Sequence, residues 1–116
     1  MNAKSPITTH VLDTAQGRPA AGVAVELLRQ NQQRAWEPLG RGVTNADGRL
    51  SDLLPPGTLL PGRYRLTFAT GEYHQRHEVN AFFPEVAIDF QVASDLEHYH
   101  VPLLISPFGY STYRGS

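Results

Sequence analysis

Turn-forming residues divide this chain into short segments, and their spacing constrains the fold more than any other feature. They occur at Gln16-Gly17, Asn45-Ala46-Asp47-Gly48, Pro55-Pro56-Gly57, Pro61-Gly62 and Pro107-Phe108-Gly109. Glycine, proline, asparagine and aspartate favour turns, and short runs between such turns are typical of strands. Several short strands at this spacing favour a sandwich or a barrel. The sequence therefore predicts an all-β fold.

Three of the segments alternate apolar and polar residues, as half-buried strands do. The apolar positions are Val23, Val25 and Leu27; Tyr64, Leu66 and Phe68; and Ile88, Phe90 and Val92. Only residues 71–80 lack this alternation and are poor in strand-forming residues. We therefore expect one short helix at 71–80 and strands elsewhere.

The segment 98–106 differs from the other strands because both of its faces are apolar. One face carries Tyr99, Val101, Leu103 and Ile105, and the other carries Pro102 and Leu104. Proline cannot donate to a ladder, so Pro102 suits an edge or an irregular stretch. A small sandwich buries only one face of each sheet. The second apolar face therefore predicts a subunit interface.

Length and composition limit the classes of protein that this chain can belong to. With 116 residues, we expect a single domain spanning 1–116. A net charge of -1 provides no basic surface for a nucleic-acid partner, and the absence of cysteine excludes disulfides, zinc–thiolate sites and thiol nucleophiles. The longest apolar run, 101–105, is too short to span a membrane. Residues 1–6 contain no apolar stretch, so we expect no signal peptide and a cytoplasmic protein.

The histidines of segment 98–106 are candidates for acid–base chemistry. His98 and His100 are two residues apart, so on a strand their rings share one face, beside Pro102 and Leu104. Desolvation there disfavours the imidazolium and would keep a histidine neutral, as a general base must be. Histidines on a strand are nevertheless more often structural than catalytic. His10, opposite the apolar face of its own segment, is a weaker candidate on this pattern alone.

Blocks of sequence along most of the chain match a known pattern. They are Ile7–Thr14 with Gly17–Ala20 and Gly22-Val23, Thr44–Arg49, Phe82–Val86 with Glu97–Pro107, and Tyr110–Ser116. Together these blocks resemble the transthyretin-related proteins that act as 5-hydroxyisourate hydrolases. In that family the chain ends on Tyr-Arg-Gly-Ser, and true transthyretins, which carry hormones, lack this ending.

The resemblance implies a transthyretin-like (prealbumin-like) β-sandwich of two sheets with one short helix and Greek-key topology. It also implies a homotetramer, a dimer of dimers with active sites in the channel between them. The catalytic residues that it implies are His10, Arg49, His100 and Ser116. The implied substrate-binding residues are Tyr113, Arg114 and Gly115, with His98 in a supporting role. No metal or organic cofactor is expected.

The implied reaction belongs to urate catabolism within purine metabolism. Water opens the six-membered ring of 5-hydroxyisourate to yield 2-oxo-4-hydroxy-4-carboxy-5-ureidoimidazoline. A neutral histidine would activate the water, and Arg49 would stabilise the negative charge that develops on oxygen. The other histidine, or the Ser116 hydroxyl, would supply a proton to the leaving ring nitrogen. Which histidine acts as the base stays open at this point.

Two other functions remain possible on the sequence. The first is a carrier that binds a small aromatic ligand in the tetramer channel and catalyses nothing. The second is a metal protein, because His98, His100 and His10 could supply three nitrogen ligands. On residue pattern alone, Arg49 could equally be a solvated side chain beyond a hairpin turn.

Overall fold

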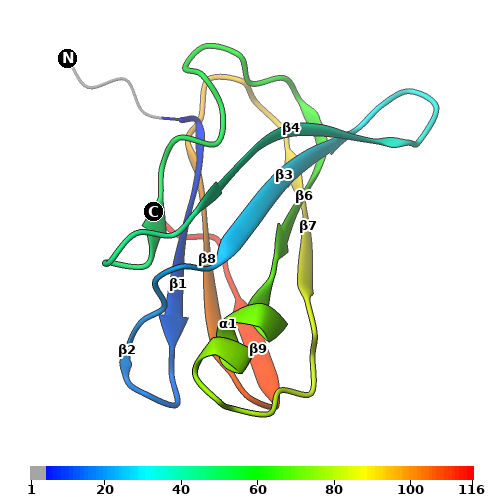
Figure 1. Ribbon diagram of the computed structural model, residues 1–116. Helices are drawn as coiled ribbons and strands as arrows, with labels where there is room; N and C mark the ends of the chain where they lie inside the picture. The colour runs from blue at the N-terminus through cyan, green and yellow to red at the C-terminus, as the bar shows by residue number, and fades with distance from the viewer. Residues whose placement is uncertain (1–4) are drawn as a thin grey trace.

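The computed structural model describes residues 5–116, which form two β-sheets and a short helix (Figure 1). The elements in chain order are β1 (Ile7–Asp13), β2 (Arg18–Pro19), β3 (Ala24–Gln30), β4 (Trp36–Val43), β5 (Arg49–Leu50), β6 (Gly62–Phe68), α1 (Thr70–Arg76), β7 (Val86–Val92), β8 (Tyr99–Ser106) and β9 (Gly109–Thr112). The predicted all-β sandwich with one short helix is confirmed.

The chain passes repeatedly from one sheet to the other. The first sheet has the order β2-β1-β8-β9, with β5 also paired to β1, and the second has the order β4-β3-β6-β7. Crossings between the sheets follow β2, β4, β5 and β7. Within the first sheet β1 and β8 pair in parallel, whereas the other strand pairs are antiparallel. This parallel pair joins the beginning of the described chain to its last third.

The core lies between the two sheets and follows the predicted alternation. In β6, Tyr64, Leu66 and Phe68 are at most 1% exposed, whereas the residues between them are half-buried. In β7, Ile88 and Phe90 are partly buried and pack against the core. Because the chain has no cysteine, burial of these apolar faces must supply most of the stability.

The helix is shorter than the sequence predicts. It ends at Arg76, and beyond it the backbone amides of His77 and Glu78 donate to carbonyls three residues earlier, each at 3.0 Å. Glu78 then adopts a left-handed φ of 58°, which ends the helical path. Residues 77–80 therefore form a turn.

Pro102 lies inside the first sheet. The sequence predicts either an edge position or an irregular stretch for this residue. Strand β8 has neighbours on both sides, and Pro102 pairs with His10 on β1. On the other side the β8–β9 ladder begins only at Leu103, and the hydroxyl of Thr112 donates to the Pro102 carbonyl at 2.7 Å. Pro102 therefore costs the β9 side no ladder bond, because the ladder is already interrupted there.

The turn before β5 is held by its own side chains and by β1. The Asn45 side-chain oxygen accepts from the backbone amides of Asp47 and Arg49 at 2.9 and 3.0 Å, and the Val11 amide donates to the Gly48 carbonyl at 2.8 Å. Gly48 has a φ of 73°, and a Cβ there would overlap the Val11 carbonyl oxygen. Glycine is therefore required for the approach that places Arg49 beside β1.

Replacing Gly48 with alanine should destabilise the fold more than the same change at Gly57. Gly57 also has a positive φ, 79°, but a Cβ there would meet nothing within 4 Å. Gly57→Ala should cost only the conformational penalty of about 1–2 kcal/mol. Gly48→Ala should cost clearly more, since the backbone of β1 must also move. Denaturant unfolding of both variants measures the difference, and equal losses would contradict this account of the turn.

Candidate active site

A single hydroxyl group contacts two histidines, His100 in β8 and His98 just before it. The parallel register places Thr8 on β1 opposite His100 on β8. The Thr8 Oγ1 lies 2.8 Å from Nδ1 of His100 and 3.0 Å from Nε2 of His98. Both are hydrogen-bond distances. The predicted sharing of one face by His98 and His100 therefore extends across the strand pair to Thr8.

Arg49 reaches the same face of the sheet from β5. Its Cα pairs with that of His10 in the antiparallel β1–β5 ladder, and side chains of paired residues lie on one face. His10 is two residues from Thr8 on β1, so His10, Thr8 and Arg49 share the outer face of the first sheet. Arg49 is exposed, whereas His10 is half-buried.

The terminal residues of the described chain fold back onto His100. Gly115 forms an isolated antiparallel bridge with His100, in which the Gly115 amide donates to the His100 carbonyl at 2.8 Å. A Cβ on Gly115 would lie only 2.6 Å from Cδ2 of the His100 ring. A larger residue would therefore push the ring or the segment away, and the segment beyond β9 could not deliver Ser116 to its position.

These groups surround an open pocket of about 220 Å³. The predicted site residues that line it are Arg49, His98, His100 and Ser116. Thr8 and Thr9 of β1 and Leu50 and Ser51 complete the lining. The structure thus gathers four of the predicted site residues at one place. His10 is not part of the lining itself but is close enough to act electrostatically on His100.

His100 is held in its neutral form. Burial lowers the pKa of His100 below its ordinary value, and the positive charge of Arg49 lowers it further. His10 and His98 act in the same direction, whereas a hydrogen bond with the Thr8 backbone opposes the shift in pKa. A cationic neighbour and a desolvated ring both disfavour the imidazolium. At neutral pH His100 can therefore accept a proton.

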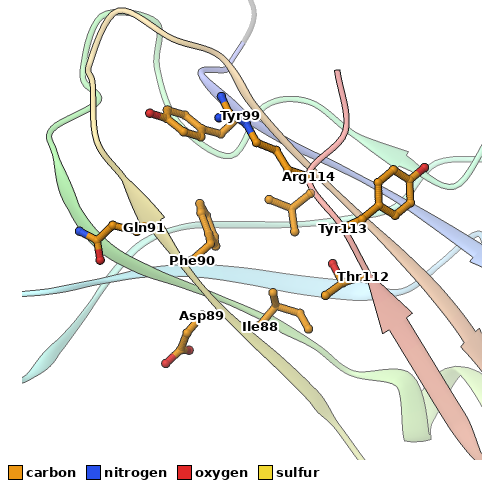
Figure 2. A pocket seen from close by; sticks show the side chains of 9 residues that line it. Ile88, Asp89, Phe90, Gln91, Tyr99, Thr112, Tyr113 and Arg114 are labelled. Carbon is orange, nitrogen blue, oxygen red and sulfur yellow. The ribbon is translucent and has the colours of Figure 1, made fainter.

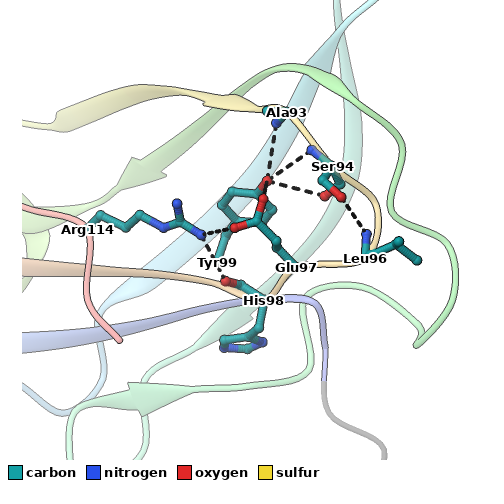
Figure 3. A network of polar contacts seen from close by, with 7 residues as sticks. All are labelled: Ala93, Ser94, Leu96, Glu97, His98, Tyr99 and Arg114. Carbon is teal, nitrogen blue, oxygen red and sulfur yellow. Dashed lines mark hydrogen bonds and ion pairs between the residues drawn. The ribbon is translucent and has the colours of Figure 1, made fainter.

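Tyr113 and Arg114 face a different part of the molecule. They line a second pocket, of about 240 Å³, with Tyr99 and residues of β7 (Figure 2). Arg114 donates to a Glu97 side-chain oxygen at 3.0 Å, and its guanidinium carbon lies 4.6 Å from the centre of the Tyr99 ring. Figure 3 shows the His98 ring pointing away from this contact. The structure therefore does not bring Tyr113 or Arg114 into the pocket that Arg49 and His100 line.

Two further observations concern ligands and membranes. Within residues 5–116, no group of three or more histidine, aspartate or glutamate side chains is placed to hold a metal ion. The three histidines considered as ligands thus do not form such a group.

In the same part of the chain, the helix is too short and too polar to cross a membrane.

Comparison with known proteins identifies the family. The model of the HIUase/Transthyretin family matches residues 7–115. This chain belongs to that family. It is 46% identical to the 5-hydroxyisourate hydrolase of Salmonella typhimurium over 110 residues. The aligned region covers 95% of this chain and 80% of that protein.

Solved structures of the family superpose closely. The 5-hydroxyisourate hydrolase of Klebsiella pneumoniae is 40% identical, with a TM-score of 0.83 over 99% of this chain and all (100%) of that one. Sea bream (Sparus aurata) transthyretin in complex with thyroxine is 29% identical, with a TM-score of 0.90 over 95% of this chain and 94% of that one. The family and the transthyretin-like fold predicted from sequence are confirmed.

Sequence reasoning missed Thr8. Its neighbours in the block Ile7–Thr14 were recognised, but its contacts are with residues 90 and 92 positions away in the chain. A threonine on a strand is ordinary, and only the parallel register of β1 and β8 distinguishes it. The available signal was its place two residues before His10, on the same face.

The cause of the low pKa of His100 can be tested by removing the charge of Arg49. We expect NMR titration to give a pKa for His100 below the ordinary value of about 6.5. Arg49→Gln should raise that pKa, because a nearby cation that disfavours the imidazolium is lost. Arg41→Gln, an exposed change on β4 in the other sheet, should leave the pKa unchanged. Equal values in the wild type and Arg49→Gln would show that Arg49 does not act on His100.

Proposed function

We propose that this protein is a hydrolase that opens the ring of 5-hydroxyisourate in urate catabolism. Family membership and 46% identity to a named 5-hydroxyisourate hydrolase over 95% of the chain carry this proposal. The gathering of His100, Arg49 and Ser116 around one pocket supports it. The 220 Å³ volume of that pocket is modest, as suits a small substrate.

His100 is the general base of the proposed reaction. Its lowered pKa keeps the ring neutral, so it can take a proton from water as the water attacks a ring carbonyl. A positioned general base typically contributes about 10²–10⁴ in rate. With His100 as the base, His10 would support the site electrostatically or donate the proton to the leaving ring nitrogen.

Arg49 stabilises the negative charge that develops on the carbonyl oxygen. Its guanidinium presents a planar fork of donors and stays charged at all relevant pH values. Preorganised charge at a developing oxyanion is usually the largest contribution to catalysis. The proton for the leaving ring nitrogen comes from His10 or from the Ser116 hydroxyl. Ser116 is exposed and lines the pocket, as such a donor must.

The remaining terminal residues have positioning roles in this proposal. Gly115 permits the close contact with the His100 ring, and Arg114 fastens the segment to Glu97 and to the Tyr99 ring (Figure 3). The Tyr99 hydroxyl is itself within 3.2 Å of the backbone of Ala93 and Ser94, which fixes the ring. Tyr113, 60% exposed, would narrow the approach to the site from a neighbouring subunit.

A single-domain homotetramer, arranged as a dimer of dimers, completes the proposal. Arg49, His98 and Ser116 are exposed on the outer face of the first sheet, so the pocket is open in one subunit. Pro102 on that face is buried near Gly115, but Leu104 is only partly covered. Packing of this face against another subunit would cover Leu104 and enclose the pocket. A cytoplasmic location would suit such an enzyme of purine metabolism.

A carrier that binds a small aromatic ligand is the second candidate. The observation that favours a carrier is the TM-score of 0.90 with sea bream transthyretin, whose structure was solved with thyroxine. However, a carrier needs neither a neutral, partly buried histidine nor a cation beside it. Fold similarity alone does not decide function.

Purified protein should accelerate the decay of 5-hydroxyisourate generated from urate by urate oxidase, with no metal or organic cofactor added. His10→Asn, Arg49→Ala and His100→Asn should each lower turnover at least tenfold, equivalent to about 1.4 kcal/mol in the barrier. His98→Asn should cost less. The decay is followed by ultraviolet absorbance.

Arg41→Ala is the matched control, since Arg41 is an exposed arginine on the other sheet. It should retain full turnover. A decay rate unchanged by micromolar wild-type protein would refute the hydrolase and favour the carrier.

The positioning role of Arg114 can be separated from substrate contact by a double-mutant cycle. Arg114→Ala should lower kcat/KM by about tenfold, because small displacements of a site carry costs of this size or larger. Glu97→Ala should cause a similar loss by removing the acceptor of the same contact. The double variant should lose no more than either single variant. Losses that multiply would instead show that Arg114 acts on the substrate directly.

A further inference from the structure

Among residues 5–116, the Thr8 hydroxyl is the one group that contacts ring nitrogens of both His98 and His100. It is 2.8 Å from Nδ1 of His100 and 3.0 Å from Nε2 of His98. Thr8 is only 6% exposed, so little water competes for these contacts. The geometry therefore constrains where the protons of the two rings can be.

A threonine hydroxyl has one proton to donate and lone pairs to accept others. It cannot donate to both rings at once. If it donates to His98, Nδ1 of His100 must carry a proton and donate to the hydroxyl oxygen. If it donates to His100, Nε2 of His98 must carry the proton instead. Each neutral ring holds one proton, so the direction of these bonds fixes which nitrogen of each ring is free.

The charge of Arg49 favours the first of these arrangements. Thr8 Oγ1 contacts Nδ1 of His100, so Nε2 is the nitrogen that is left for the pocket that Arg49 and His100 line together. A guanidinium beside the ring favours a lone pair over a proton on the nitrogen that faces it. The single proton of neutral His100 is therefore on Nδ1, and the hydroxyl proton is then directed to His98.

We propose that Thr8 is a positioning residue that sets the tautomers of both histidines: its hydroxyl accepts from Nδ1–H of His100 and donates to Nε2 of His98. Neutral His100 then carries its lone pair on Nε2, the nitrogen turned away from Thr8. This is the nitrogen that would take the proton from water. That Nε2 of His100 takes a proton from water rests on the proposed function. The tautomers of the two rings do not depend on it.

The charges around the two histidine rings favour the same direction of the hydrogen bonds with Thr8. Arg49 from β5, His10 from β1 and His98 from the segment before β8 all act on His100 as positive charges or potential positive charges. Ser51, just after β5, and Ser116, from the terminal segment, are the other polar side chains from outside β1 and β5 that line the pocket. None of these side chains is an anion that would hold a second proton on the ring. A single proton, on Nδ1, is therefore the favoured state of His100.

The experiment is ¹⁵N NMR of the histidine rings in the full-length protein without substrate, at a pH where both rings are neutral. The wild type should show His100 protonated at Nδ1, and His98 protonated at Nδ1 with Nε2 as acceptor. Thr8→Ser retains the hydroxyl and should preserve both tautomers. Thr8→Val has nearly the same shape without the hydroxyl, so His98 should move to Nε2–H and His100 should lose its single tautomer.

Thr9→Val is the matched control. It also removes a buried threonine hydroxyl from β1, but that hydroxyl donates to the Val101 carbonyl at 2.6 Å. Its histidine tautomers should equal those of the wild type. If Thr8→Val does not fold, the wild-type and Thr8→Ser spectra still decide the inference, because His100 protonated at Nε2 would overturn it. Unchanged tautomers in a folded Thr8→Val would overturn it equally.

Turnover gives the second readout. Thr8→Val should lower kcat at least about tenfold, a part of what a general base supplies, and should leave KM nearly unchanged. Thr8→Ser should recover most of the lost rate. A loss confined to KM would show that Thr8 binds substrate and does not act through His100. If the tautomers are as proposed but no hydrolysis is detected, the proposed function fails and the tautomer assignment stands.

Discussion

The parallel pairing of β1 with β8 is the constraint on which the rest of the site depends. It places Thr8 opposite His100 and His10 opposite Pro102 across a sequence separation of 92 residues. Because side chains alternate between faces, a slip of one residue would turn Thr8 and His10 into the core and bring Ile7 or Thr9 to the outer face. The buried Ile7 and Val11 on β1, with Val101 and Leu103 on β8, prevent that slip. Core packing thus fixes the register, and the register assembles the site.

Two glycines allow further segments to approach this strand pair closely. Gly48 lets the turn before β5 lie against Val11, which brings Arg49 beside His10. Gly115 lets the terminal segment lie against the His100 ring. The result is a histidine partly removed from water with a guanidinium nearby, two effects that both lower its pKa. The same contacts that hold the chain together locally therefore favour the neutral form of His100, which can accept a proton.

Local pattern predicted much of this structure, and long-range pairing accounts for what it missed. The alternation in β3 and β6 and the polar break around α1 follow from neighbouring residues, so they could be read directly. The interior position of Pro102 could not, because it depends on an interruption of the β8–β9 ladder. The contact between Thr8 and the histidines likewise depends on which strands pair. Family resemblance supplied His10, Arg49 and His100, but it could not separate Arg114, which faces Glu97, from Ser116, which lines the pocket.

The comparison with transthyretin shows why backbone similarity cannot assign function here. Sea bream transthyretin superposes with a TM-score of 0.90, above the 0.83 of the Klebsiella pneumoniae hydrolase, although its sequence identity is lower, 29% against 40%. The sandwich therefore tolerates extensive differences in sequence with little change in backbone. Binding an aromatic ligand needs an apolar surface and a few polar contacts. Hydrolysis needs in addition a base held neutral, with its lone pair directed at water, and a fixed positive charge for the oxyanion. Those requirements concern protons and charges. The Thr8 hydroxyl between two imidazole rings therefore says more about the function of this protein than the course of its strands does.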